Sequence, residues 1–347
     1  MAGSSLGNFF KVTTWGESHG KSVGVIVDGC PAGLSLSEED IQVYLDRRRP
    51  GTGKLVTARQ EKDEAQIMSG IFEGKTTGTP ICILIWNQDS RSSDYSQIAF
   101  CYRPGHADYT FDAKYGFRDY RGGGRQSGRE TVGRVAGGAV AMKILKELGI
   151  DVAVRVTEIG GRAIGPGERI EEAVQVEEGN SLGGIVECRV NGLPAGLGAP
   201  VFDKLDAKLA QAVMSIGAVK GVEFGDGFAA AKSTGQENND AFFLGEHGIE
   251  KETNHAGGVL GGISDGSELI LRAAVKPTPS IGLPQRTVNR EGKAVTLRIR
   301  GRHDAVIVPR AAVVIQSMTA LVLTDLLLEN MTVKMDSLKV FYGRAGG

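Results

Sequence analysis

One short segment combines three side chains that could do chemistry. Gly16-Glu17-Ser18-His19-Gly20 places an acid, a hydroxyl and an imidazole between two glycines. His19 titrates near neutral pH, so it could act as a general acid or base. The spacing around Ser18 matches a hydrolase nucleophile elbow, but that elbow needs a helix after its strand. Because the chain from Ser22 onward predicts another strand, we disfavour the elbow, and a hairpin turn with a surface histidine stays open.

The clearest ligand signal is a group of arginines around a triple glycine. Between residues 118 and 134, five arginines and two acids give a local charge of +3 in a chain of formal charge −1: Arg118, Arg121, Arg125, Arg129 and Arg134 against Asp119 and Glu130. Gly122-Gly123-Gly124 then leads through residues 125–128 into a predicted helix. Backbone N–H groups at a helix N-terminus, together with arginines, predict an anion site. Ser127 stands where a dinucleotide fingerprint needs its third glycine, so a Rossmann site is not supported.

Two other segments carry charged or titratable groups on turns. Residues 47–49 are three arginines at the end of a predicted helix, and Lys54 follows a glycine-rich turn. These cations could clamp phosphate or carboxylate, although a helix C-terminus alone also favours basic residues. The segment lacks the Walker A spacing. In Arg103-Pro104-Gly105-His106-Ala107-Asp108 the Pro-Gly turn presents His106, but the ligand number for zinc is not reached, and we predict no metal site.

Positioning these groups requires both strands and helices. Periodicity and β-branched runs predict strands at residues 9–15, 22–28, 79–86, 152–159, 183–190, 269–275 and 295–299. Helical spacing and capping residues predict helices at 37–48, 129–148, 200–214 and 309–330, the last of which we expect to pack centrally. Residues 87–110 and 232–240 read as irregular polar loops. Without a regular strand–helix rhythm the class is α+β, and without a visible linker residues 1–347 form a single domain.

Composition narrows the class of protein. A formal charge of −1 speaks against a general nucleic-acid binder, and 50 glycines indicate many tight turns. The four cysteines are scattered without a C-x-x-C pair, which fits a reducing cytoplasm. The first ten residues lack the pattern of a signal peptide. No stretch of 18 uninterrupted apolar residues occurs, so we expect no membrane span.

Taken together, these segments resemble the chorismate synthase family over residues 6–328. The markers stand in the family's order: Gly-Glu-Ser-His-Gly at 16–20, Asp-Arg-Arg-Arg-Pro-Gly-Thr at 46–52, Glu-Gly-Lys-Thr-Thr-Gly-Thr-Pro at 73–80, Arg-Pro-Gly-His-Ala-Asp at 103–108, Tyr-Arg-Gly-Gly-Gly-Arg at 120–125, Asn-His-Ala-Gly-Gly at 254–258, Lys-Pro-Thr-Pro-Ser at 276–280 and Gly-Arg-His-Asp at 301–304. Each motif alone is weak, but the ordered combination is specific.

The resemblance implies an activity and an architecture. The activity is the conversion of 5-enolpyruvylshikimate 3-phosphate to chorismate and phosphate, a 1,4-elimination in the shikimate pathway. It requires reduced FMN and makes no net redox change, with NADPH only as an indirect source of reductant. The implied fold is a β-α-β sandwich with helices packed between two antiparallel sheets, assembled as a homotetramer.

The resemblance also implies roles for single residues. His19 would stabilise or protonate the departing phosphate, His106 would sit near the flavin, and Asp304 would help relay the C6 proton through flavin N5. Ser18 and Ser127 would be hydrogen-bond partners in these relays. The groups implied to bind substrate or NADP are Arg47, Arg48, Lys54, Arg129 and Arg134. Those implied to bind FMN are Arg125, Gln126, Ser127, Gly217, Ala218, Gly261, Lys276, Pro277, Thr278, Pro279, Ser280 and Arg302.

Three positions depart from the family pattern. Lys54 stands where the family often has Arg, which puts bidentate anion binding there in doubt. Gln126 replaces a frequent Ser, and Ala305 stands where Pro is common. Two other functions stay open from the residues: a flavin oxidoreductase that uses the same arginines and glycine loops, and an RNA-binding module built on residues 118–134. The near-neutral charge and the few aromatics oppose the RNA-binding module.

Overall fold

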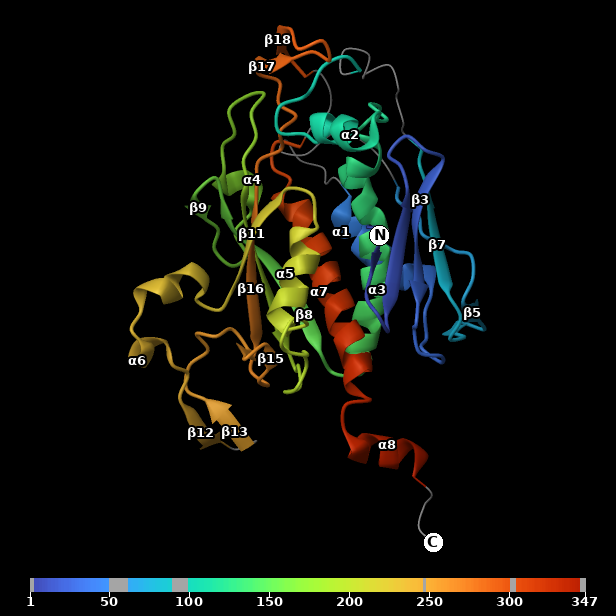
Figure 1. Ribbon diagram of the computed structural model, residues 1–347, viewed down its shortest axis with the longest axis vertical. Helices are drawn as coiled ribbons and strands as arrows, with labels where there is room; N and C mark the ends of the chain where they lie inside the picture. The colour runs from blue at the N-terminus through green and yellow to red at the C-terminus, as the bar shows by residue number, and fades with distance from the viewer. Residues whose placement is uncertain (1–2, 50–61, 89–98, 246–247, 300–303, 344–347) are drawn as a thin grey trace.

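The computed structural model describes residues 3–49, 62–88, 99–245, 248–299 and 304–343 and combines helices with antiparallel sheets (Figure 1). The first sheet has five strands in the order β1-β2-β3-β7-β4, and all neighbouring pairs are antiparallel. In β7 the alternate residues Ile81, Ile83 and Ile85 are buried, as a sheet with one covered face requires. The strands are β1 (Ser5–Leu6), β2 (Lys11–Gly16), β3 (Ser22–Asp28), β7 (Ile81–Trp86) and β4 (Gln66–Ile67).

The second sheet also has five antiparallel strands, in the order β11-β16-β10-β8-β9. Its centre is the pair β10 and β16, whose register runs from Gly184 opposite Val275 to Val190 opposite Leu269. This register ends β16 immediately before the predicted flavin segment 276–280. The strands are β11 (Val219–Phe224), β16 (Leu269–Val275), β10 (Gly184–Asn191), β8 (Asp151–Ile159) and β9 (Arg162–Ala163).

Two long helices lie between the sheets. Helix α3 (Thr131–Glu147) packs on β2, β3 and β7, and helix α7 (Val308–Asn330) packs on β8, β10 and β16 (Figure 1). The two helices also pack on each other. Helix α7 is long and apolar enough to cross a membrane, with a mean hydropathy of 1.9 over its most apolar window, but 89% of that window is buried inside the protein. Its composition therefore reflects its place in the core.

Shorter elements surround this core. Helix α1 (Glu38–Arg48) packs on α3 and α7, and helix α5 (Leu205–Met214) packs on α7 and β11. The remaining helices are α2 (Asp108–Tyr115), α4 (Ile170–Ala173), α6 (Gly235–Asn238) and α8 (Met335–Tyr342), with 3-10 turns η2 (Gly124–Gln126), η3 (Gly128–Glu130) and η4 (Gly227–Lys232). The hairpins are β5 (Ile71–Phe72) with β6 (Lys75–Thr76), β12 (Phe242–Gly245) with β13 (Gly248–Lys251), β14 (Val259–Leu260) with β15 (Ile263–Ser264), and β17 (Gln285–Val288) with β18 (Ala294–Leu297).

The α+β prediction is confirmed, and most predicted elements are found. The strands at 22–28 and 269–275 match β3 and β16 residue for residue, and the predicted central helix is α7. Three predictions are wrong. The irregular loop expected at 87–110 ends earlier, because helix α2 begins at Asp108. The helix expected from residue 200 begins at Leu205, because Asp203 and Ala199 pair as a bridge and Phe202 is 92% exposed. The loop expected at 232–240 contains α6, which Thr234 and Glu237 cap reciprocally.

Candidate active site

The Gly-Glu-Ser-His-Gly segment is a tight turn between two strands, as predicted. Strands β2 and β3 pair up to Gly16 opposite Val23, and the N–H of Gly20 donates to the carbonyl of Glu17 at 3.1 Å. Ser18 is buried, and its Oγ lies 3.1 Å from Nδ1 of His19. Since β3 follows the turn, Ser18 is not at a strand-to-helix elbow. The turn presents His19 with Ser18 as its hydrogen-bond partner.

The triple glycine lies directly against this turn. Gly122 has φ +59°, and a Cβ there would stand 2.4 Å from Cε1 of His19 and 2.7 Å from Oγ of Ser18. The Ser18 N–H also donates to the carbonyl of Gly124 at 3.4 Å. Only a residue without a side chain can approach the imidazole this closely. Two segments about a hundred residues apart in the chain therefore form one surface.

The arginine after the triple glycine fixes this contact. The Arg125 guanidinium donates to the carbonyl of Thr14 at 3.1 Å, to its Oγ1 at 2.9 Å and to the carbonyl of Gly16 at 3.3 Å. Its hydrogen bonds therefore hold the glycine segment onto the end of β2. Gln126 and Ser127 follow it on the same short turns.

The predicted anion cradle at a helix N-terminus takes a different form. Two 3-10 turns, η2 and η3, precede α3, and their N–H groups donate within the segment. The N–H of Gln126 bonds to Gly123 at 2.9 Å, that of Glu130 bonds to Ser127 at 3.1 Å, and that of Arg129 bonds to Oγ of Ser127 at 3.3 Å. Ser127 acts as the cap of η3. These donors are satisfied by the protein, so arginine side chains are left as the main cations for an anion.

Arg48 and Arg129 meet at a buried acid, Asp63. Arg48 Nη2 donates to Asp63 at 2.7 Å, Arg129 Nη1 pairs with the other oxygen, and the Asp63 side chain is fully buried. Burial acts to raise the pKa of Asp63, but the two guanidiniums outweigh it and lower the pKa below its ordinary value. Burial lowers the pKa of Arg48 to about 10, so Arg48 stays charged at neutral pH. Both predicted clamps are thus held inside the protein.

Asp304 joins the same cluster through Arg310. The Arg310 guanidinium pairs with the buried Asp304 carboxylate and donates from Nε to the backbone carbonyl of Arg48 at 2.9 Å. Arg310 lies in the first turn of α7, so the central helix positions Asp304 against the end of α1. The Nε of Arg48 is buried and has no hydrogen-bond partner among the described residues.

The other two predicted clamps point elsewhere. Arg47, one residue before Arg48 on α1, donates to Oε1 of Gln316 on α7 at 2.8 Å. Arg134 on α3 bonds to Glu130 at 2.9 Å and to Oγ of Ser215 at 2.6 Å. Arg134 lines the cleft that is described below, and Arg47 does not. The two predicted clamps therefore do not face the same site. Lys54 and Arg302 lie outside the described residues.

The His106 turn packs on the predicted flavin segment. His106 Nε2 lies 2.7 Å from Oγ of Ser280, and its Nδ1 lies 3.0 Å from the carbonyl of Pro104. A carbonyl only accepts, so Nδ1 carries the proton. Burial, followed by the charge of Arg103, lowers the pKa of His106 to about 4, so the ring is neutral at pH 7. Nε2 then accepts from the Ser280 hydroxyl, whose oxygen keeps lone pairs for another donor.

Further contacts join this turn to its neighbours. Lys276 Nζ donates to the carbonyl of Gly105 at 2.8 Å, and the Lys276 N–H donates to the carbonyl of Ala218 at 2.8 Å. Arg103 forms a buried bidentate pair with Asp108, at 2.8 Å for each bond, and its Nη2 would lie 3.8 Å from a Cβ on Gly123. Four segments are therefore neighbours: 103–108, 122–125, 217–218 and 276–280.

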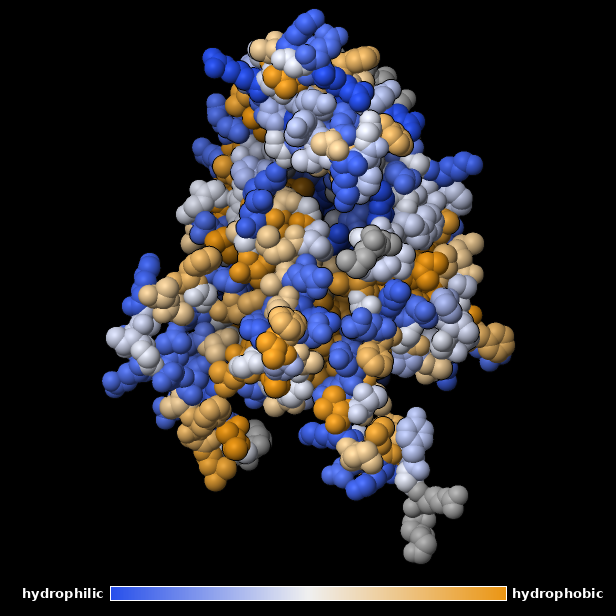
Figure 2. All heavy atoms as spheres, viewed as in Figure 1, coloured by the Kyte–Doolittle hydropathy of each residue, from blue (hydrophilic) through white to orange (hydrophobic). Residues whose placement is uncertain are grey.

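A cleft of about 740 Å³ borders two of these segments, at Gly123 to Arg125 and at Gly217. The lining includes Arg125, Gln126, Arg134 and Gly217, together with three aromatic side chains from α2 and the residues that follow: the half-buried Phe111 and the exposed Tyr115 and Phe117. Figure 2 shows a hydrophilic hollow beside the N-terminus at this end of the molecule. Thr278 Oγ1 is buried without a hydrogen-bond partner among the described residues. The cleft has the size and the mixed lining of a small-molecule site.

Gly261 is not brought to this cleft. It lies in the turn between β14 and β15, whose Gly262 carbonyl accepts from the N–H of Leu205 at the start of α5. Ser215 and Gly217 follow the other end of α5, about 15 Å away along the helix. Gly261 therefore sits apart from the other predicted flavin residues within the chain.

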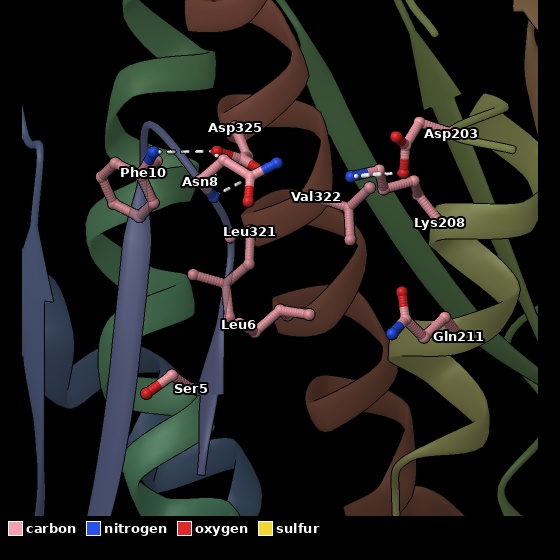
Figure 3. Close-up of a pocket in the computed structure, with 11 residues that line it drawn as sticks. Ser5, Leu6, Asn8, Phe10, Asp203, Lys208, Gln211, Leu321, Val322 and Asp325 are labelled. Atoms are coloured by element: carbon pink, nitrogen blue, oxygen red, sulfur yellow. Dashed lines mark hydrogen bonds and ion pairs between the residues drawn. The ribbon is translucent and has the colours of Figure 1, made fainter. Parts of the chain in front are cut away.

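A second cavity, of about 330 Å³, contains none of the predicted site residues (Figure 3). It lies between the N-terminal segment, α5 and α7. At its edge the buried Asp325 accepts the N–H groups of Asn8, Phe9 and Phe10 at 2.7–3.1 Å. These bonds anchor the first strands to α7, which is a structural task.

Three residues of the cluster around Asp63 were not predicted from the sequence: Asp63, Asn87 and Arg310. Asp63 and Asn87 stand in polar segments, and Arg310 stands in the first turn of the otherwise apolar helix α7, so none of them fitted a catalytic pattern. For the two acceptors, Asp63 and Asn87, the sequence gives only an indirect indication. Buried arginines need acceptors, and the sequence has many arginines on both sides of these residues. Only the fold shows which acceptors they reach.

Comparisons with known proteins agree with the resemblance. The model of a family described as chorismate synthase matches residues 10–328. A chorismate synthase of Lachnospira eligens is 58% identical, with the match covering 99% of this chain and 100% of the relative. One from Agathobacter rectalis is 56% identical with 99% of each covered, and one from Methanosarcina barkeri is 52% identical with 95% and 97% covered. A crystal structure of a chorismate synthase superposes with a TM-score of 0.73 at 31% identity over 96% of each chain. The chain belongs to the chorismate synthase family, lyases of the shikimate pathway.

Proposed function

We propose that this chain converts 5-enolpyruvylshikimate 3-phosphate to chorismate and phosphate by a 1,4-elimination that requires reduced FMN. Membership of the family supports the reaction. In the structure, the observation that carries the proposal is the contact of Gly122 with Ser18 and His19. It sets a titratable imidazole beside a cationic, glycine-rich surface, which is what a departing phosphate needs.

The substrate carries a phosphate and two carboxylates, so its site must supply cations and a proton. Arg134 lines the cleft and is the clearest direct contact. Arg48 and Arg129 are buried, so their charge is screened less than at the surface. His19 stabilises or protonates the leaving phosphate, with its ring held by Ser18. Asp304, held by Arg310, helps to relay the proton that leaves C6.

The residues predicted to hold reduced FMN fit such a group. The cleft volume lies in the range of cofactor sites, and the buried Thr278 Oγ1 lacks the partner that a bound ligand would supply. Residues 125–127, 217–218 and 276–280 would hold it. When bound, reduced FMN supplies electron density that a C6 position remote from any carbonyl lacks. Neutral His106 keeps the Ser280 hydroxyl in place.

An anaerobic assay with chemically reduced FMN tests the proposal. The expected result is chorismate and phosphate in equal amounts, without stoichiometric oxidation of the flavin. His19→Ala is expected to lower kcat by about 100-fold or more, the range of a lost general acid. Oxidation of flavin in step with turnover would instead favour an oxidoreductase. Steeply salt-dependent RNA binding without flavin binding would favour the RNA-binding module.

We propose several broader properties on the same basis. The helices α3 and α7 form the middle layer of the family's sandwich, with residues 1–347 as one domain. The enzyme works as a homotetramer in the cytoplasm, where its four free cysteines stay reduced. An external reductant reduces FMN, with NADPH acting only indirectly.

A further inference from the structure

We infer that Asn87 is a positioning residue that holds the His19 turn and ties it to Arg129. Asn87 directly follows β7, the strand next to β3 in the first sheet. This places its side chain beside the turn that joins β2 to β3. The inference rests on the proposed function, because it assigns Asn87 a task in presenting His19.

The Asn87 amide makes hydrogen bonds to three partners. Its Nδ2 donates to the carbonyl of Glu17 at 3.0 Å and to the carbonyl of Gly20 at 2.8 Å. Its Oδ1 accepts from Nε of Arg129 at 2.8 Å. Carbonyls only accept and Nε–H only donates, so the partners fix the orientation of the amide. The backbone N–H of Asn87 also donates to the carbonyl of Lys21 at 3.1 Å.

The two carbonyls bracket His19 on either side in the sequence. Held by a single rigid amide, Glu17 and Gly20 cannot separate or rotate freely, so the backbone between them keeps one shape. That shape sets the imidazole against Gly122, where a Cβ would stand 2.4 Å from the ring. Small displacements of a catalytic group cost large factors in rate. Asn87 therefore acts on the reaction through His19 and not by touching the substrate.

The third hydrogen bond makes the turn part of a larger network. Arg129 reaches Asp63, Asp63 reaches Arg48, and the Arg48 carbonyl accepts from Arg310, which pairs with Asp304. Asn87 links this buried charge cluster to the His19 turn. Through it, residues at positions 19 and 304 belong to one connected structure.

Two substitutions separate the two links. Asn87→Asp keeps the size and the Oδ1 acceptor for Arg129 but sets a second oxygen against the carbonyls of Glu17 and Gly20. Asn87→Ala removes all three bonds. If Asn87 acts through the turn, both variants lower kcat by about 10- to 100-fold with a small change in KM. Near-normal kcat in Asn87→Asp would overturn the inference, because the Arg129 link alone would then suffice. Asn239→Asp, the same change at an exposed residue after α6, is the matched control.

A double-mutant cycle with His19→Ala shows whether the effect runs through His19. In the His19→Ala background, Asn87→Ala is expected to lower the remaining rate by less than about threefold. An equal loss in both backgrounds would show that Asn87 works elsewhere. Thermal unfolding checks that each variant is folded, and the near-isosteric Asp variant carries the test if the Ala variant is not.

A spectroscopic measurement is independent of the enzyme assay. The chain has five histidines, so the ring signals of His19 in a histidine-labelled sample can be assigned by their loss in His19→Gln. Both Asn87 variants should shift the His19 ring signals, and Asn239→Asp should not. Unchanged His19 signals would refute the positioning role even in an active enzyme. Shifted signals in a chain that fails the elimination assay would leave the positioning role in place and refute the proposed function alone.

Discussion

At Gly122 the absence of a single atom decides whether the site can form. The space that a Cβ would take is filled by Cε1 and Nδ1 of His19 and by Oγ of Ser18, all within 2.7 Å. The positive φ of this residue adds a second reason for glycine. Two functional hypotheses that the sequence offered separately, a histidine turn and a glycine-arginine segment, are therefore one site. The ring of His19 is packed against backbone and not exposed on a hairpin tip.

His106 leads to a pH prediction. Its pKa in the folded protein is about 4, against 6.5 for an ordinary histidine, because burial disfavours the charged ring. Between these values the unfolded chain binds a proton that the folded chain does not, so stability rises with pH from about 4 to 6.5 and is lost on acidification through that window. The contribution is at most about 3 kcal/mol, and less where solvent reaches the ring.

Urea unfolding between pH 7 and 4.5 measures this contribution. His106→Gln removes the titrating group, so the free energy of unfolding should fall less steeply with acidification than in the wild type. The same slope in both proteins would mean that His106 titrates normally in the folded state.

Residue type and spacing singled out His19 and His106 as candidates, because few side chains titrate near neutral pH, whereas Asp304 was predicted only from the resemblance to the family. They did not identify Asp63 or Asn87. Both bond to Arg129, which lies more than forty residues away in the sequence. In the sequence itself they look like ordinary polar loop residues. Arg47 and Arg48 show another limit of prediction from residue type. They are adjacent and chemically equal, yet the turn of α1 sends one to Gln316 and the other to Asp63.

At the scale of elements, periodicity predicted the core well and the periphery poorly. Most residues of β3, β16 and α7 are buried. The apolar pattern of each sequence therefore reflects a single environment, the protein core. Peripheral elements bury little. Helix α6 depends on a capping pair over four residues, and the start of α5 depends on a hydrogen bond to Gly262, a partner that periodicity cannot show.

The close packing of α3 on α7 gives a prediction at this scale. A Cβ on Gly138 would stand 2.3 Å from Cβ and 2.7 Å from Cα of Ser317. Ala is the better helix former by about 1 kcal/mol, but overpacking a core costs about 1–3 kcal/mol and a backbone atom cannot turn away. Gly138→Ala should therefore lower Tm measured by calorimetry at a fixed scan rate.

Gly235→Ala is the control, since a Cβ at this helical position in α6 would meet no atom within 4 Å. It should leave Tm unchanged or raise it slightly. An increase in Tm for Gly138→Ala would show that the helices lie farther apart than described.

At the scale of the whole molecule, the two sheets and their helices gather residues from the entire chain into one cluster. The His19 turn comes from the first sheet, the Ser280 segment from the end of the second, and Asp304 from the start of α7. Hydrogen bonds through Asn87, Arg129, Asp63, Arg48 and Arg310 connect the His19 turn with Asp304. The order of motifs in the sequence could indicate that they share a function, but only the antiparallel pairing of distant strands shows how they meet.

The molecular surface bears on the proposed homotetramer. At one end of the long axis, the β12–β13 hairpin carries Leu244 opposite Ile249, with exposures of 85% and 79% (Figures 1 and 2). Contiguous apolar side chains of this kind mark association surfaces.

Light scattering of the purified chain should give a molar mass about four times 36.7 kDa. The pair of substitutions Leu244→Lys and Ile249→Lys should lower it, because charge cannot be buried there without a partner. Val288→Lys, on the β17–β18 hairpin at the opposite end, should leave the mass unchanged. A wild-type mass of 36.7 kDa would refute the tetramer, and an unchanged mass in the Lys variant would move the interface to another surface.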